Sequence, residues 1–288
     1  MADTPAGMGT PVMLAVLAAA MMHAGWNALI RGAPDKALYT VLLHLCSAVL
    51  AVPVLAVVGL PAWDCWPYAV ASAVLHSVYI ALLMRAYEGG QLAVSYVLMR
   101  GTAPLLVCLA SGPLLGEPLG LAGWLGVTGI LGGIVLIASA SGQPLSTVVR
   151  HPSGRAAMLN AVFIAAYTLV DGQGARASGN PLGYVLVLAL VEPIAVLVVQ
   201  LRRSPQALLT YARTHWPLGF LGATTASGAY ATVLWAMTHA PIAVVAAMRE
   251  SSVIFAVLIG SLWFKEGHLR IGLTAAGLVA VGVVFVKR

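Results

Sequence analysis

The sequence is poor in charge. Lys, Arg, Asp and Glu make up 8% of its 288 residues, while hydrophobic residues make up 60%; soluble domains carry about 25% charged residues. A water-soluble fold of this length needs more polar surface than this chain provides. The composition excludes an ordinary soluble protein and predicts an all-α integral membrane protein whose helices face lipid.

Cysteine and clustered basic residues are also scarce. Cys46, Cys65 and Cys108 form no CxxC pair and no even disulfide framework, so we interpret them as small apolar packing residues. The net charge is +6, but Lys and Arg are scattered through short loops rather than gathered in a basic stripe. This pattern argues against nucleic acid as a partner.

Signatures of catalysis are absent from the sequence. It contains no HExxH, GxSxG, P-loop or dinucleotide fingerprint, and no His, Cys and acidic cluster with metal-ligand spacing. We therefore predict no catalytic residue, no metal and no cofactor. Because an ATP motor is also missing, any transport would be driven by an ion gradient, by exchange or by the substrate's own gradient. An intramembrane enzyme or a structural subunit is the least favoured alternative.

Ten apolar runs have the length that crosses about 30 Å of hydrocarbon. The segment before Thr10 lacks a signal-peptide pattern, so we expect the first run to be a spanning helix. The polar connections 141–155 and 201–215 are too short for another domain. The predicted helices cover residues 12–30, 38–58, 67–86, 92–113, 119–139, 156–172, 182–200, 216–237, 242–263 and 269–287.

The second half of the chain repeats the first. Arg100 and Arg249 each follow a methionine and each precede a glutamate, Glu117 or Glu266, by the same spacing. The alignment predicts two five-helix repeats, 12–139 and 156–287. An odd number of helices forces the two copies into opposite orientations across the membrane, so we expect an inverted repeat.

Loop charges set the expected orientation. The connections after helices 1, 3, 5, 7 and 9 hold most of the basic residues, so the positive-inside rule makes them cytoplasmic and turns both termini outward. Lys287 and Arg288 argue against this orientation. We expect a multi-pass protein of the cell (inner or plasma) membrane. The basic residues of these connections are Arg31, Lys36, Arg85, Arg150, Arg155, Arg202, Arg203, Arg213, Lys265 and Arg270.

The chain resembles the EamA-type members of the drug/metabolite transporter superfamily over nearly its whole length. The resemblance is carried by residues 99–104 running to Gly-Glu-Pro at 116–118, by their partners 248–251 and 265–267, and by His-Ala-Gly-Trp-Asn at 23–27. It implies a secondary transporter that works by alternating access, usually as an exporter. The second copy has Val253 where the first has Pro104, so we expect the two equivalent helices to be kinked differently.

The paired arginines are the main candidates for substrate binding. Both lie near mid-depth in their helices, where a guanidinium costs about 2.5–3.5 kcal/mol even on insertion scales. Two cations favour an anionic or zwitterionic substrate bound through its carboxylate. Tyr96 lies one turn before Arg100, and Ser252 holds a related position after Arg249. The alternative is that each arginine binds backbone carbonyls or a buried acid such as Glu250.

Further polar side chains share faces of predicted helices. His23, Trp26 and Asn27 have i, i+3, i+4 spacing on the first helix. Tyr79 and Tyr230 occupy equivalent places in the third and eighth helices. We predict that these five residues line the substrate site, although helix packing explains each of them about as well.

Three acidic residues are candidates for proton coupling. Glu250 ranks first, because a carboxylate in low dielectric can load and release a proton; pairing with an arginine is the alternative. Glu192 precedes Pro193, which can produce a kink by itself. Asp171 lies near the predicted end of the sixth helix, where ordinary solvation would suffice. Asn160, Tyr167 and Asp171 form a weaker polar stripe.

Glycines dominate the fifth and tenth helices. Small residues allow close backbone approach, so these helices are predicted to form a packing surface, including that of a homodimer, rather than part of the cavity. Glu117 and Glu266 are expected at helix ends near the membrane interface. The glycines are Gly120, Gly123, Gly126, Gly129, Gly132 and Gly133 in the fifth helix and Gly272, Gly277 and Gly282 in the tenth.

These observations predict a secondary transporter for a small polar metabolite, such as an amino acid or organic anion. The lipid bilayer and the small-molecule substrate are its expected partners. A flippase for a lipid-linked or amphipathic substrate is the alternative, since it would use the same architecture with an opening toward lipid.

Overall fold

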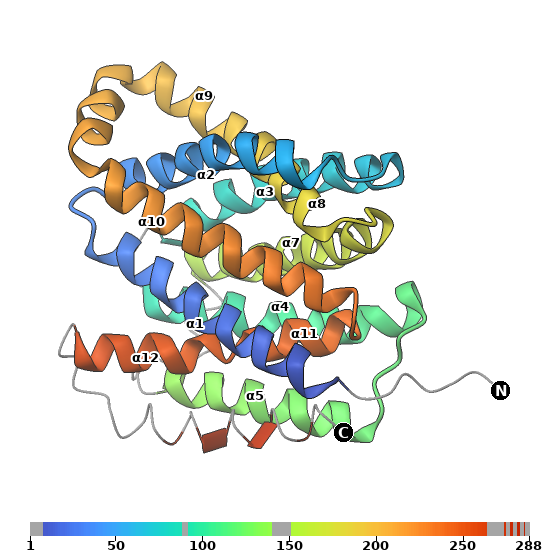
Figure 1. Ribbon diagram of the computed structural model, residues 1–288. Coiled ribbons are helices and arrows are strands. Elements are labelled where there is room, and N and C mark those ends of the chain that lie inside the picture. Colours follow the sequence, from blue (N-terminus) through green and yellow to red (C-terminus); the bar gives the residue numbers. More distant parts are fainter. Residues whose placement is uncertain are drawn as a thin grey trace.

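The computed structural model of the chain describes residues 8–87, 92–139 and 151–263, together with residues 274, 277, 278, 281, 282 and 285. All regular structure in these residues is helical (Figure 1). The first part contains α1 (Thr10–Gly32), α2 (Lys36–Val58), the short 3₁₀ helix η1 (Trp63–Cys65), α3 (Trp66–Tyr87), α4 (Leu92–Leu115) and α5 (Leu121–Ser139). The second part contains α7 (Pro152–Ala177), α8 (Pro181–Val191), α9 (Pro193–Arg203), α10 (Pro205–Met237), α11 (Ile242–Arg249) and α12 (Ser252–Leu262).

Six helical segments of the described chain are long and apolar enough to cross a membrane. Large apolar side chains are exposed along them, among them Val52, Val57 and Val70, as expected of surfaces that face lipid. Trp63 and Trp263 are each 82% exposed and lie at opposite ends of the bundle, where tryptophan anchors spanning helices at the interface. The chain is an integral, multi-pass membrane protein.

Helices coincide with nine of the ten predicted segments, and the tenth, 269–287, lies largely outside the described residues. The prediction was wrong in one connection: residues 201–215 are almost entirely helical, because α9 ends at Arg203 and α10 begins at Pro205. Ser204 permits this sharp turn by capping the new helix, accepting a hydrogen bond from the Ala207 amide at 3.4 Å. The 33 residues of α10 span about 50 Å, so this helix continues beyond the hydrocarbon.

Proline and short polar side chains set where the helices begin. Pro152, Pro181, Pro193 and Pro205 are each the first residue of a helix, a position where the missing N–H is not needed. Asp35 accepts a hydrogen bond from the Leu38 amide at the start of α2, and Asn180 accepts one from the Gly183 amide at the start of α8. The helix boundaries therefore follow from local chemistry.

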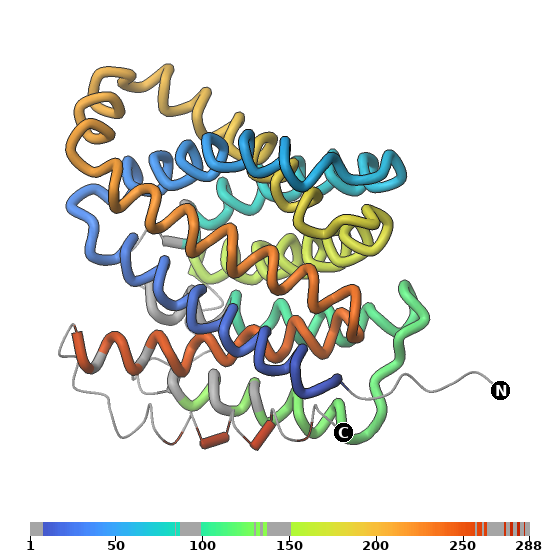
Figure 2. The backbone as a smooth tube through the Cα atoms, in the orientation of Figure 1, coloured from blue at the N-terminus to red at the C-terminus, as the bar shows by residue number. Residues whose placement is uncertain are grey.

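The helices run back and forth between two ends of the molecule. At the right of Figure 1 lie the α2–α3, α4–α5, α7–α8 and α10–α11 connections, which we call the even end. At the left lie the α1–α2 and α9–α10 connections and the end of α12, which we call the odd end. Figure 2 traces α10 from the odd end to the even end, opposite in direction to α3. The direction of α7 is likewise opposite to that of α1.

Two helices form the buried centre. α11 is buried along its whole length, from Ile242 to Arg249. α7 packs against α3 and α4, and its buried face carries polar side chains, Asn160, Thr168 and Asp171, among alanines and glycines. Buried polar groups in a membrane helix face the bundle interior and mark functional positions. The centre of the fold is thus where the candidate site has to be sought.

The glycine-rich face of α5 packs within the chain at one described point. A Cβ placed on Gly129 would lie 3.1 Å from the Cα of Gly282, so the two backbones touch. Each glycine comes from one of the two helices predicted to be rich in small residues. This contact joins them inside one molecule, and a homodimer through the remaining glycines stays a prediction.

Gly129→Leu should lower the free energy of unfolding by about 1–3 kcal/mol, because the new side chain overpacks the contact with Gly282. Gly132→Leu is the matched control: it lies on the same helix, and a Cβ there meets no atom of the described residues within 4 Å. Thermal unfolding in detergent measures the difference. Equal destabilisation by the two variants would contradict the contact, and loss of a dimer in Gly132→Leu alone would place a subunit interface on the open face.

Candidate functional site

The two predicted arginines meet at a single carboxylate. Arg100 of α4 and Arg249 at the end of α11 are buried, and Glu250, buried to 1% exposure, lies between them. Arg100 Nε is 2.8 Å from Glu250 Oε2, and Arg249 Nε is 3.7 Å from Glu250 Oε1. Arg100 also donates from Nη2 to the Ser252 hydroxyl at 2.9 Å. The two arginines that the sequence alignment pairs therefore share one buried site.

The site has an excess of positive charge when Glu250 is ionised, since two guanidiniums face one carboxylate. Arg249 Nε has no hydrogen-bond partner of good geometry among the described residues. A buried charged donor without a full set of partners is costly. A second carboxylate or another anion entering this place would therefore be favoured.

The helix that carries Arg249 is interrupted at the site. Beyond α11 the amides of Glu250, Ser251, Val253 and Ile254 each donate to the carbonyl three residues earlier, at 2.9–3.1 Å. This tight 3₁₀ stretch separates α11 from α12 and turns the Glu250 side chain toward both arginines. Broken spanning helices at mid-depth are a common feature of transporter binding sites.

The two helices that the sequence alignment pairs differ, as predicted, but the interruption does not lie in the helix that contains Pro104. α4 is continuous through Pro104 and Pro113, whereas the interruption falls in the copy with Val253. The loss of one backbone hydrogen bond at a proline does not force a break when neighbouring helices support the turn. The ion pairs of Glu250 accompany the interruption of the proline-free copy.

The other residues predicted to line the substrate site do not all lie beside the arginines. His23 is close enough to Arg100 and Arg249 for their charges to act on it, and its ring packs edge-on against Trp26 at 5.0 Å. Asn27 donates back to the His23 carbonyl at 2.7 Å, so its amide serves its own helix. Trp26 packs with Tyr39 in the cluster between α1, α2 and α10. The side chain of Tyr96 lies outside the described residues.

A second buried cluster surrounds Asp171. Its carboxylate accepts a hydrogen bond from Tyr184 of α8 at 3.0 Å and a short one from Tyr230 of α10. The expected solvation at a helix end is wrong, because α7 continues for six residues past Asp171, to Ala177, and Asp171 is fully buried. Tyr230 therefore binds a carboxylate of the protein itself.

His76 of α3 links this region to Glu192. Its Nδ1 lies 3.2 Å from Glu192 Oε1 and 3.1 Å from the Ser72 hydroxyl. Glu192 occupies the break between α8 and α9, directly before Pro193. The predicted effect of the proline is therefore present, and the break leaves the glutamate side chain facing an imidazole.

Tyr167 lies between the two clusters. Its ring stacks on His76 at 4.1 Å and meets Tyr79 edge-on at 5.6 Å. The charges of Arg100 and Arg249 act on its hydroxyl from one cluster and that of Asp171 from the other. The polar stripe of Asn160, Tyr167 and Asp171 on α7, which the sequence indicated only weakly, thus lies at the centre of the site.

Tyr184, Ser72 and Arg176 were not singled out in the sequence. Tyr184 and Ser72 stand alone in apolar runs, so only the fold brings them to Asp171 and His76. Among the described residues, no group of three His, Cys, Asp or Glu is placed to hold a metal ion. The three cysteines are free and buried, in agreement with a packing role.

A cavity of about 380 Å³ lies at the odd end. It is bounded by the end of α1, the starts of α2 and α10 and the end of α12, with Tyr39, Tyr211 and Trp263 among its lining residues. The Tyr211 hydroxyl is buried and lacks a hydrogen-bond partner of good geometry among the described residues. None of the described residues that line the cavity belongs to the arginine site.

Comparison with known proteins agrees with this geometry. Residues 153–288 match the family model described as "EamA-like transporter family". A crystal structure with 18% sequence identity superposes with a TM-score of 0.77, covering 96% of this chain and 98% of the other, which establishes a shared fold. No curated protein matches the chain. This match to the EamA-like transporter family agrees with the resemblance drawn from the sequence and suggests a membrane transporter of the drug/metabolite type.

Proposed function

We propose that the chain is a ten-helix secondary transporter of the cell membrane, made of two inverted repeats over residues 12–139 and 156–287. It exports a small polar metabolite that carries a carboxylate or similar anionic group, by alternating access. The opposite directions of α1 and α7, and of α3 and α10, support the inverted repeat (Figure 1). The direction of transport is an expectation from the family.

One observation carries the proposed substrate class: two buried arginines share a single carboxylate. Glu250 occupies the place that a substrate carboxylate would take, so we propose that substrate replaces it there. The forked guanidinium groups give such a ligand paired, charge-assisted hydrogen bonds. The excess positive charge favours anions over neutral molecules.

Energy coupling is assigned to the buried acids. Glu250, displaced from the arginines, would take up a proton because an unpaired carboxylate is poorly solvated there. Asp171 and Glu192 form the second candidate group, connected to the first through Tyr167 and His76. No catalytic residue and no cofactor enters this scheme.

A ligand screen tests the proposal. Carboxylate metabolites should raise the unfolding temperature of the purified protein, whereas their matched amides or esters should not; a ligand at 100 times its Kd adds about 2.7 kcal/mol. Ligands that pass should be transported in proteoliposomes. If the neutral analogues raise the unfolding temperature as much as the acids do, the proposed substrate site is refuted. Scrambling of labelled lipid, with no response to soluble acids, would establish the flippase instead.

A further inference from the structure

Glu117 lies where the two halves of the protein meet at the even end. It follows Gly116, whose φ of 69° ends α4 and turns the chain. Its Oε1 is 2.6 Å from Arg176 Nη1, and its Oε2 accepts a hydrogen bond from the Ile242 amide at 3.0 Å. Its expected place at a helix end is thus correct, but its partners come from the second half.

Arg176, at the end of α7, completes the contact. Besides Glu117 it binds two carbonyl oxygens of the α10–α11 connection, donating from Nε to Met237 at 2.8 Å and from Nη2 to Ala240 at 3.1 Å. Both side chains of the pair are partly shielded, with 27% and 18% exposure, so the contact is stronger than an open surface pair. We call Glu117 and Arg176 the latch.

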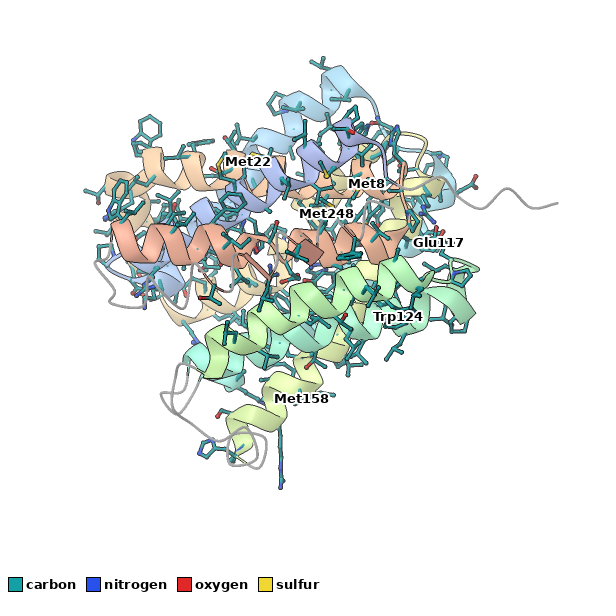
Figure 3. All side chains as sticks on the ribbon, turned by 90° about the horizontal axis from the view of Figure 1, so that it is seen from below. Met8, Met22, Glu117, Trp124, Met158 and Met248 are labelled. Atoms are coloured by element: carbon teal, nitrogen blue, oxygen red, sulfur yellow. The ribbon has the colours of Figure 1, made fainter. Side chains whose placement is uncertain are left out.

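The latch holds one end of the helix whose other end carries Arg249. α11 has only eight residues, so Ile242 and Arg249 are about 10 Å apart along its axis. A carboxylate at the first amide also suits the helix dipole. Because α11 is short and buried throughout, movement at Ile242 is transmitted to Arg249. Figure 3 shows Glu117 toward the same end as Met8, with Met248 nearer the middle.

The cavity at α1 and α12 lies at the odd end, opposite the latch. Resting on the function proposed above, we infer that Glu117 and Arg176 are positioning residues: while paired they close the even end and fix Arg249 against Glu250. The pair opens once in each transport cycle, when substrate passes the even end. Breaking it therefore exposes the buried surface between α4 and α11.

Cys108 provides a built-in reporter for that surface. It lies on α4, is 3% exposed, and its Sγ is 4.0 Å from the carbonyl oxygen of Ala243, next to Ile242. In a chain with Cys46→Ala and Cys65→Ala, a membrane-impermeant maleimide can react at Cys108 alone. Its rate of labelling measures opening without any substrate, so this test can fail independently of the proposed function.

Glu117→Gln should raise the labelling rate of Cys108 about tenfold from the even face and leave it unchanged from the odd face. Arg176→Lys, which keeps the charge but not the fork, should give an intermediate rate, and Arg176→Gln a rate like that of Glu117→Gln. Asp64→Asn, an exposed acid of the same end, is the matched control. Intact cells and inverted vesicles distinguish the faces.

Folding is checked by the unfolding temperature, and if Glu117→Gln does not fold, Arg176→Lys carries the test. A merely structural contact would lower the unfolding temperature without a sided change in labelling. The inference is overturned if the latch variants label at the rate of Asp64→Asn, or equally fast from both faces.

Discussion

Arg100→Ala is expected to abolish transport, with a loss of at least a hundredfold, while the protein still inserts into the membrane. The variant removes the 2.8 Å ion pair with Glu250 and the hydrogen bond to Ser252. It also removes the excess positive charge, leaving Glu250 to pair with Arg249 alone. Breaking a buried pair costs about 3–5 kcal/mol of stability, so folding has to be measured beside activity.

The double variant Arg100→Ala, Glu250→Ala separates charge from geometry. It restores one excess positive charge with Arg249 alone, and it should be less stable than Arg100→Ala because the buried Arg249 guanidinium then loses its carboxylate. If a pair of guanidinium forks binds substrate, transport stays lost. Initial rates in proteoliposomes are compared with Arg85→Ala, an exposed arginine at the odd end. Transport by Arg100→Ala at the control rate would refute the site.

Apolar run lengths predicted most of the fold, because the cost of unpaired backbone in lipid makes spanning segments helical. Run lengths did not predict the two points where one helix ends and the next begins almost at once. These points are Ser204 and the Glu250–Ser251 turn. At Ser204 the signal was present as a cap followed by proline, but polarity suggested a loop. At Glu250 the turn coincides with ion pairs to two arginines, one of which is 150 positions distant in the sequence.

The candidate site was predictable where one type of residue repeats. Arg100 and Arg249 were found as equivalent positions, and the alternative of pairing with Glu250 was weighed from adjacency alone. The stripe of Asn160, Tyr167 and Asp171 was a weak sequence signal. The role of a polar helix face depends on the side chains that pack against it from other helices, and these cannot be identified from one helix alone. His76, Tyr184 and Tyr230 provide that packing from three other helices.

The latch illustrates the same limit. Glu117 was noticed because it repeats, and its distance of about 25 Å along the helix from Arg100 correctly excluded a direct pair. Arg176 was not singled out in the sequence. The contact of Glu117 with Ile242 requires the second half to return to the even end, which periodicity within one helix does not encode.

Glu250→Gln should separate binding from energy coupling. In the native protein a substrate carboxylate competes with Glu250 for the arginines, so protonation of Glu250 at low pH tightens binding and deprotonation at high pH weakens it. Glutamine keeps the shape but brings no charge to Arg100 or Arg249. Substrate should bind at least tenfold more tightly near neutral pH, which is about 1.4 kcal/mol, and its affinity should no longer follow pH.

Transport then divides into two measurements. Exchange of labelled for unlabelled substrate should persist in Glu250→Gln, since both arginines remain, whereas accumulation driven by a pH gradient should be lost. Glu192→Gln and Asp171→Asn are the informative comparisons, because these acids face His76, Tyr184 and Tyr230 rather than the arginines. If either of them loses gradient-driven accumulation while Glu250→Gln retains it, the proton is carried by the second cluster.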